Sequence, residues 1–150
     1  MNKKYKFLIF TLLGILLFSF IVTGGCSSIT GEDNDTQPPN QQIFDITTQK
    51  AYDLIQENAD NPDFIILDVR TPEEYDSGYI EGAINIDYNS EDFSAQLETL
   101  DKDKTYLIYC RTGRRSAGAR DVMEELGFRE VYNMSGGIVE WEAQGLPIVR

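Results

Sequence analysis

The segment from Cys110 to Ser116 combines a thiol with an unusual density of positive charge. It reads Cys-Arg-Thr-Gly-Arg-Arg-Ser, and Arg120 follows shortly after it. Three of the chain's 13 basic residues lie in the first six positions, so ten remain, and four of these ten fall between positions 110 and 120. Nearby cations and backbone amides stabilise a thiolate and commonly lower a cysteine pKa to about 3.5–7.5. Cys110 is therefore a candidate nucleophile that needs no general base.

The same loop has the features of an anion-binding site. A loop between a strand and a helix directs backbone N–H groups toward one point, where the helix dipole adds about half a positive charge. Gly113 permits the positive φ that a cradle of amides requires. The clustered cations predict a nearby anion, either the thiolate or an anionic substrate. The alternative is a structural cysteine with arginines that only solvate a helix end; the loop length, Gly113 and the three loop arginines favour a reactive site.

Composition excludes several other kinds of site. The sequence contains no histidine, which removes Ser-His-Asp triads, Cys-His proteases and zinc sites with histidine ligands. The two cysteines are Cys26 and Cys110, and if Cys26 is consumed by modification no intramolecular disulfide or thiolate cluster can form. We therefore expect no metal site and assign no cofactor. From residue 26 onward there are ten basic and 25 acidic residues, a net charge of −15, which argues against nucleic acid and anionic lipid as partners.

Residues 1–25 have the pattern of a signal peptide. Three lysines precede an apolar run from Phe7 to Val22, and small residues then lead to Cys26. The ending Thr23-Gly24-Gly25-Cys26 resembles the lipobox of bacterial lipoproteins, in which the cysteine receives diacylglycerol and becomes the mature N-terminus. The alternative is an uncleaved anchor, because the 19 residues from Phe7 to Gly25 are long enough to span a bilayer. The small residues beside a cysteine favour lipidation at Cys26.

The leader and the following segment predict the location of the protein. Either reading of the leader places the chain outside the cytoplasm, anchored to the bacterial cell membrane. Residues 26–42 are polar and acidic with little to bury, so we expect the lipidated cysteine to be followed by a disordered tether. Residues 43–150 then form the globular domain.

Short apolar runs and helical patterns alternate from Ile43 to the end of the chain. The predicted strands cover residues 43–46, 64–67, 83–86, 106–109 and 131–133. Helices are predicted between them, with the clearest start at Thr71-Pro72-Glu73-Glu74, a capping box with proline in the first turn. Strict alternation predicts an α/β fold with a small, mostly parallel sheet flanked by helices. Sites in such folds form at the carboxyl ends of strands, where Cys110, Asp68 and Arg70 are expected.

Several motifs together resemble the rhodanese family of sulfurtransferases. The active-site loop of that family is similar to the segment that begins at Cys110. Other family motifs follow in order along residues 43–150: Leu67-Asp68-Val69-Arg70, Glu74-Tyr75, the run from Gly78 to Ile86, and Asn133-Met134-Ser135-Gly136-Gly137-Ile138 with Trp141. The resemblance covers the whole predicted domain, and the set of motifs is highly specific.

The resemblance implies a rhodanese-like sheet and a two-step reaction. Cys110 would take sulfane sulfur as a persulfide from a small sulfur-containing anion such as thiosulfate, and pass it to a thiol or to cyanide. The implied substrate-binding residues are those of the loop and of the second strand's end: Arg111, Thr112, Gly113, Arg114, Arg115, Asp68 and Arg70. Asp68 would bond to the active loop, although a plain turn carboxylate stays equally open. Tyr79 stands where many relatives have histidine, and we interpret it as a packing position.

Two other functions stay open at the level of sequence. Cysteine-dependent phosphatases and arsenate reductases also use a thiolate in an anion cradle, and rhodanese-like modules also serve as binding domains without catalysis. The phosphatase signature has one residue more between cysteine and arginine than the four that separate Cys110 from Arg115. A binding module often lacks the cysteine. The sequence therefore favours sulfur transfer.

Overall fold

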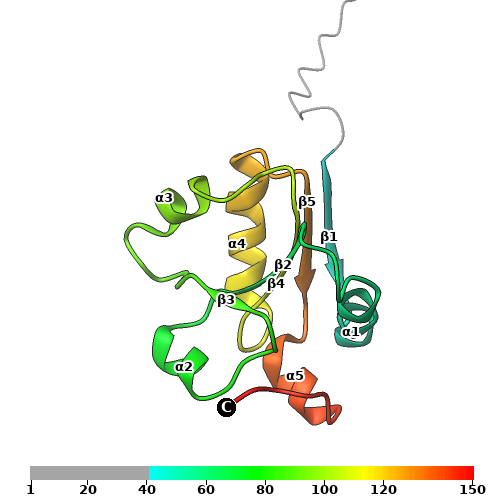
Figure 1. Cartoon of the computed structure of the whole chain (residues 1–150). Coiled ribbons are helices and arrows are strands. Elements are labelled where there is room, and N and C mark those ends of the chain that lie inside the picture. Colours follow the sequence, from blue (N-terminus) through cyan, green and yellow to red (C-terminus); the bar gives the residue numbers. More distant parts are fainter. Residues whose placement is uncertain (1–40) are drawn as a thin grey trace, which may run out of the picture. The chain divides into compact units, whose positions relative to one another are not determined.

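A computed structural model describes residues 41–150, which form an α/β domain (Figure 1). Its strands are β1 (Gln42–Ile46), β2 (Phe64–Asp68), β3 (Ile84–Asn85), β4 (Thr105–Tyr109) and β5 (Glu130–Met134). Its helices are α1 (Thr48–Glu57), α2 (Pro72–Asp76), α3 (Phe93–Glu98), α4 (Arg114–Glu125) and α5 (Gly137–Ala143). The predicted leader and tether, with Cys26, lie outside the described residues up to position 40.

The five strands form one sheet in the order β1-β5-β4-β2-β3, and every paired strand is parallel. The predicted fold class is confirmed. The carboxyl ends of the strands lie together at the edge of the sheet near α5 and α2 (Figure 1). β4 lies between β5 and β2, so the residue after it emerges at the middle of that edge. That residue is Cys110.

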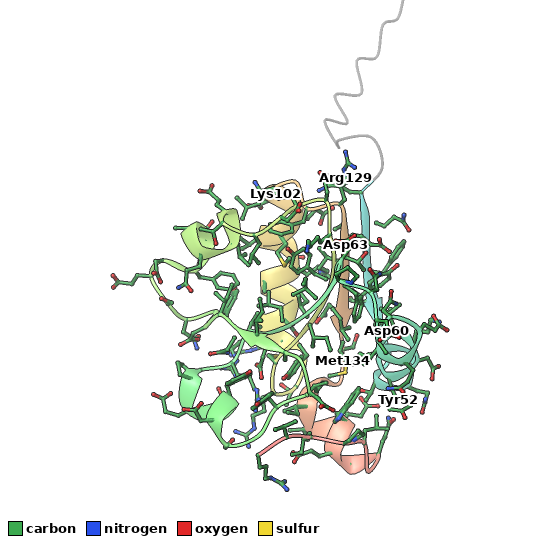
Figure 2. All side chains as sticks on the ribbon, viewed as in Figure 1. Tyr52, Asp60, Asp63, Lys102, Arg129 and Met134 are labelled. Carbon is green, nitrogen blue, oxygen red and sulfur yellow. The ribbon has the colours of Figure 1, made fainter. Side chains whose placement is uncertain are left out.

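Side chains of alternate strand residues enter two separate core layers, as a period of two requires. Tyr106, Ile108 and Cys110 face the layer with α3 and α4, and Leu107 and Tyr109 face the layer with α1 and α5. Figure 2 shows side chains on both faces of the sheet, with Tyr52 and Met134 in the second layer. Because the central strands are covered on both faces, their sequences are continuous apolar runs.

Local signals place most element boundaries. Thr47 accepts a hydrogen bond from Lys50 N at the start of α1, and both halves of the capping box at Thr71 are formed at the start of α2. The third strand is shorter than predicted, since only Ile84 and Asn85 pair with β2. Across residues 41–150, no helix combines the length and the apolar character needed to cross a bilayer.

Candidate active site

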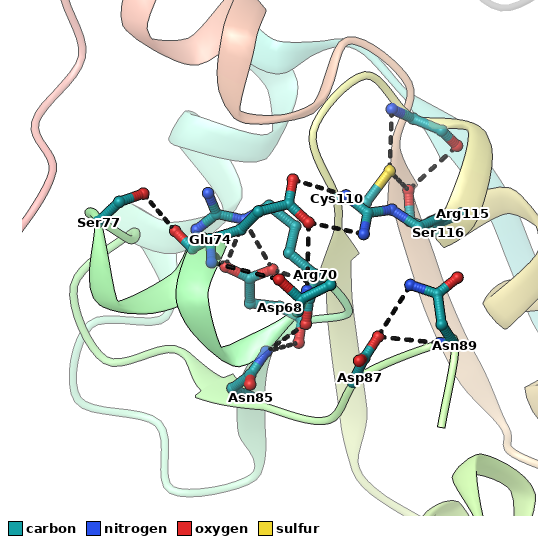
Figure 3. Close-up of polar contacts among 12 residues, drawn as sticks. Asp68, Arg70, Glu74, Ser77, Asn85, Asp87, Asn89, Cys110, Arg115 and Ser116 are labelled. Carbon is teal, nitrogen blue, oxygen red and sulfur yellow. Dashed lines mark hydrogen bonds and ion pairs between the residues drawn. The ribbon is translucent and has the colours of Figure 1, made fainter. Parts of the chain in front are cut away.

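Cys110 lies between the end of β4 and the start of α4, at the base of a short loop (Figure 3). Its side chain is buried, with only 1% of the residue exposed. Gly113 caps α4 with φ 93°, which is the left-handed conformation that the sequence predicted for this glycine. This turn directs the Gly113 amide toward the thiol, and the Gly113 N to Cys110 Sγ distance is 3.2 Å.

Hydrogen bonds to sulfur lower the pKa of the Cys110 thiol. Burial acts against this by penalising the charged thiolate, but hydrogen bonds outweigh it: they come from the Ser116 hydroxyl and from the backbone amides of Ser116, Thr112 and Gly113. The Ser116 hydroxyl is 3.5 Å from Sγ and 3.1 Å from the Gly113 carbonyl. Ser116 is fully buried, so water does not compete for it. The thiolate is stabilised as a nucleophile without histidine.

The segment from β5 into α5 holds this loop in place. Ile138 N donates to the Cys110 carbonyl at 2.9 Å, and Val139 N donates to the Arg111 carbonyl at 3.1 Å. A Cβ atom on Gly113 would lie 1.8 Å from the Ser135 carbonyl oxygen, and one on Gly137 would lie 2.5 Å from the Arg111 carbonyl oxygen. Both glycines are therefore required by close backbone approach. The sequence predicted the left-handed turn at Gly113, but it showed Gly137 only within a family motif and assigned it no contact with the loop.

Arg115 is held by a carboxylate of the protein itself. Its guanidinium donates two hydrogen bonds to Glu74, at 2.7 and 2.8 Å (Figure 3). These bonds raise the pKa of Arg115 and lower the pKa of Glu74. Glu74 also accepts a bond from Thr71 N as part of the capping box, so one side chain both starts α2 and fixes an active-loop arginine. Sequence reasoning found only the first role.

A cavity of about 360 Å³ opens above the thiol. It is lined by four loop residues besides Cys110 and by two residues from elsewhere: Arg111, Thr112, Arg114, Arg115, Glu74 and Asn89. Asn89, in the segment after β3, was not predicted from the sequence. Arg111 and Arg114 are exposed and have no ion pair with any residue of 41–150, whereas Arg120 is paired with Asp45 and Asp121. The anion predicted from the sequence is therefore needed to balance the charge of Arg111 and Arg114 only. Arg115 and Arg120 are already paired with carboxylates.

This geometry suits nucleophilic attack by the Cys110 thiolate on an anionic substrate. Comparison with known proteins decides the family: the sequence model of the rhodanese-like domain matches residues 47–144. The chain belongs to the rhodanese-like domain family. Relatives named as sulfurtransferases place it with rhodanese-type enzymes; one of these, from Allochromatium vinosum, is 36% identical over 96 residues, covering 64% of this chain and 88% of that protein.

Other relatives show that this rhodanese-like domain also occurs in larger proteins. A tRNA uridine(34) hydroxylase from Pectobacterium carotovorum is 36% identical over 104 residues, but this match covers only 29% of that protein and 64% of this chain. Among solved structures, a rhodanese-related protein from Thermoplasma volcanium has a TM-score of 0.60 and 32% identity, over 70% of this chain and 96% of that one. The rhodanese-like fold is therefore shared along nearly the whole of that structure.

Asp68 and Arg70 of the rhodanese-like domain lie outside the cavity of Cys110. Their side chains form a buried ion pair with an Nη2 to Oδ2 distance of 2.6 Å, and Arg70 also donates to the Gly78 carbonyl. The carboxylate of Asp68 is thus occupied by Arg70, where the family resemblance implied a bond to the active loop. Arg70 lies 5.7 Å from the centre of the Tyr109 ring and lines a neighbouring cavity.

Aromatic residues of the rhodanese-like domain serve packing, as predicted for Tyr79. Tyr106, Tyr109 and Trp141 are buried in the two core layers. Tyr79 stacks on Tyr75 at a centroid distance of 4.2 Å, and it pairs through its backbone with Val149 near the C-terminus.

Within residues 41–150, no group of three or more acidic or cysteine side chains is placed to hold a metal ion.

Proposed function

We propose that this domain transfers sulfane sulfur, carrying it as a persulfide on Cys110 between an anionic donor such as thiosulfate and a thiol or cyanide acceptor. One observation carries the proposal: a buried thiol with a lowered pKa lies at the base of a cavity lined by three arginines. Thiosulfate has two negative charges, which suit the unpaired Arg111 and Arg114. The sulfurtransferase named among the relatives supports the same reaction class.

The reaction balances with the groups present. The Cys110 thiolate attacks the outer sulfur of thiosulfate, the S–S bond of the donor breaks, and sulfite leaves with the electron pair. The terminal sulfur of the persulfide then takes the place of the thiolate among the loop amides. Cyanide attacks that sulfur, thiocyanate leaves, and the Cys110 thiolate is restored. No second cysteine lies within residues 41–150, so the sulfur must leave to an acceptor outside this part of the chain.

The loop size favours sulfur over phosphate. In a loop with one more residue, the arginine would take position 116; here Ser116 fills it and bonds to the thiol. A tight ring of amides suits a single terminal sulfur and crowds the oxygens of a phosphoryl group. We therefore expect thiocyanate formation from thiosulfate and cyanide, and no Cys110-dependent hydrolysis of an aryl phosphate.

The decisive experiment is replacement of the thiol. Cys110→Ser should abolish thiocyanate formation while the circular dichroism spectrum and melting temperature stay near those of the wild type, because the hydroxyl is nearly isosteric. Intact mass after incubation with thiosulfate should show one added sulfur atom in the wild type and none in the variant. Substantial turnover by the variant would remove Cys110 as the carrier, and faster hydrolysis of aryl phosphate than thiocyanate formation would favour a phosphatase. A wild type without either activity would favour a binding module.

We also propose that the mature chain begins at a diacylated Cys26 and is held at the outer side of the bacterial cell membrane. The support is the sequence pattern of the leader, with small residues directly before the cysteine. Cys26→Ser should block processing, which intact mass and membrane fractionation would report. A variant that is cleaved and anchored like the wild type would contradict lipidation.

A further inference from the structure

A second cavity of about 280 Å³ adjoins the cavity of Cys110. Glu74 and Arg111 line both cavities, so the two meet at these side chains. The second cavity is also lined by Arg70, by Ser77 and by residues of α5. Figure 3 shows Arg70, Glu74 and Ser77 on the same side of the loop. Sulfur transfer from thiosulfate to cyanide uses the first cavity only, and it leaves the second cavity without a role.

Ion pairs neutralise every charged side chain of the second cavity except one. Arg70 is paired with Asp68, Glu74 with Arg115, and Glu142 with Arg150 at 3.1 Å. Arg111 has no carboxylate partner among residues 41–150. The cavity thus offers a single uncompensated cation, located at its boundary with the thiol. A guanidinium in that position binds a carboxylate through paired hydrogen bonds.

Part of the lining of the second cavity is apolar: Ile138 and Val139 of α5, on the helix that also carries Glu142. Ile138 is buried, but Val139 is 47% exposed, although it is a large hydrophobic residue beside the candidate active site. Both belong to the first turn of α5, and their amides bond to the carbonyls of Cys110 and Arg111. These bonds fix this apolar part of the lining relative to the thiol. A ligand with a short aliphatic stem would cover Val139 and remove that surface from water.

We propose that this second cavity is the acceptor subsite and that it takes a small thiol bearing a carboxylate. The inference rests on the proposed sulfur transfer. The carboxylate pairs with Arg111, the stem lies against Ile138 and Val139, and the thiolate reaches the persulfide. That thiolate attacks the outer sulfur, the S–S bond to Cys110 breaks, and the Cys110 thiolate leaves with the electron pair. The products are the acceptor's persulfide and the free enzyme.

The test compares two acceptors of matched length, 3-mercaptopropionate and 3-mercaptopropanol, with thiosulfate as donor and sulfite release as the measurement. In a two-step transfer, kcat/KM for the thiol reports only the second step, so effects on donor binding cancel. In the wild type we expect kcat/KM to be about tenfold higher for 3-mercaptopropionate than for 3-mercaptopropanol, because a charge-assisted hydrogen bond contributes about that factor. Arg111→Gln should remove most of this preference. Val139→Glu should also reduce it, because it places a like charge at the subsite.

Phe44→Glu is the matched control, because Phe44 is 49% exposed and lies on β1, away from the loop. Phe44→Glu adds the same charge as Val139→Glu, and the ratio of kcat/KM for the two acceptors should stay as in the wild type. Thiocyanate formation with cyanide separates the two proposals: its absence overturns the sulfur transfer itself. If thiocyanate forms but the wild type shows no carboxylate preference, or if the preference survives in both Arg111→Gln and Val139→Glu, the subsite inference is wrong. Transfer to protein thiols alone would also overturn it.

Discussion

At the scale of single residues, burial raises the pKa of the Cys110 thiol, and hydrogen bonds from neighbouring groups outweigh it and lower the pKa. Of the four arginines between positions 110 and 120, Arg115 and Arg120 are paired with carboxylates of the protein. Ser116 instead contacts the sulfur directly from a fully buried position. The side chain that matters most for the thiolate is therefore neutral.

Ser116→Ala should raise the pKa of Cys110, since the Ser116 hydroxyl contributes to lowering it and burial then acts with less opposition. A lowered pKa keeps the thiolate populated at lower pH, so losing the hydroxyl moves the midpoint of thiol reactivity upward. The measurement is the rate of alkylation by iodoacetamide as a function of pH. Ser94→Ala on the exposed face of α3 is the control and should leave the midpoint in place. A midpoint that does not move in Ser116→Ala would show that the amides alone stabilise the thiolate.

Arg115→Ala should lower kcat/KM for thiosulfate by about tenfold or more, the value of hydrogen bonds to charged groups. The variant loses a cation and also leaves the Glu74 carboxylate unpaired at the rim of the cavity, where it repels the donor. Adding Glu74→Gln should restore part of the loss, because glutamine at this position still completes the capping box. If the double variant is no more active than Arg115→Ala, the unpaired carboxylate is not the cause.

At the scale of elements, the loop is shaped by the β5–α5 connection. Gly113→Ala should reduce the free energy of unfolding by at least about 2 kcal/mol, from the left-handed backbone and from overpacking against the Ser135 carbonyl. Gly127→Ala is the matched control: φ is 85°, but no atom lies within 4 Å of the added Cβ, so only the backbone cost of about 1 kcal/mol applies. Urea denaturation measures the free energy of unfolding of both variants. Equal destabilisation would mean that the close approach to Ser135 relaxes without cost.

At the scale of the whole molecule, β1 belongs to the domain although the family match begins one residue after it. All five of its residues pair with β5, and Asp45 accepts a hydrogen bond from the buried side chain of Asn133. A chain that starts at residue 41 should therefore melt at the temperature of the longer protein. A chain that starts at residue 48 should melt at a lower temperature or without a cooperative transition. The Asn133 side chain loses the hydrogen bond that it donates to Asp45, at a cost of about 1–3 kcal/mol, and β5 becomes an edge strand. Equal melting temperatures would make β1 dispensable.

The sequence by itself determined the elements and the position of the thiol. Continuous apolar runs predicted the buried strands, the Thr71 capping box predicted the start of α2, and Cys110 followed from its place between a strand and a helix. Each of these signals depends on residues close together in the chain. The parallel sheet also followed from the alternation of elements, so the carboxyl edge could be named as the location of the site.

Only the tertiary structure decided which charges are free to act. Glu74 and Arg115 are 41 residues apart, and their pairing depends on α2 and the Cys110 loop meeting at the same edge of the sheet. The order β1-β5-β4-β2-β3 produces that meeting, and no local pattern encodes it. The same order brings α5 beside Arg111, whereas Asp68 and Arg70 are two residues apart and pair locally. Side-chain pairing across elements depends on distances that chain spacing does not fix. The sequence therefore could not show that, among residues 41–150, Arg115 has a carboxylate partner and Arg111 and Arg114 have none.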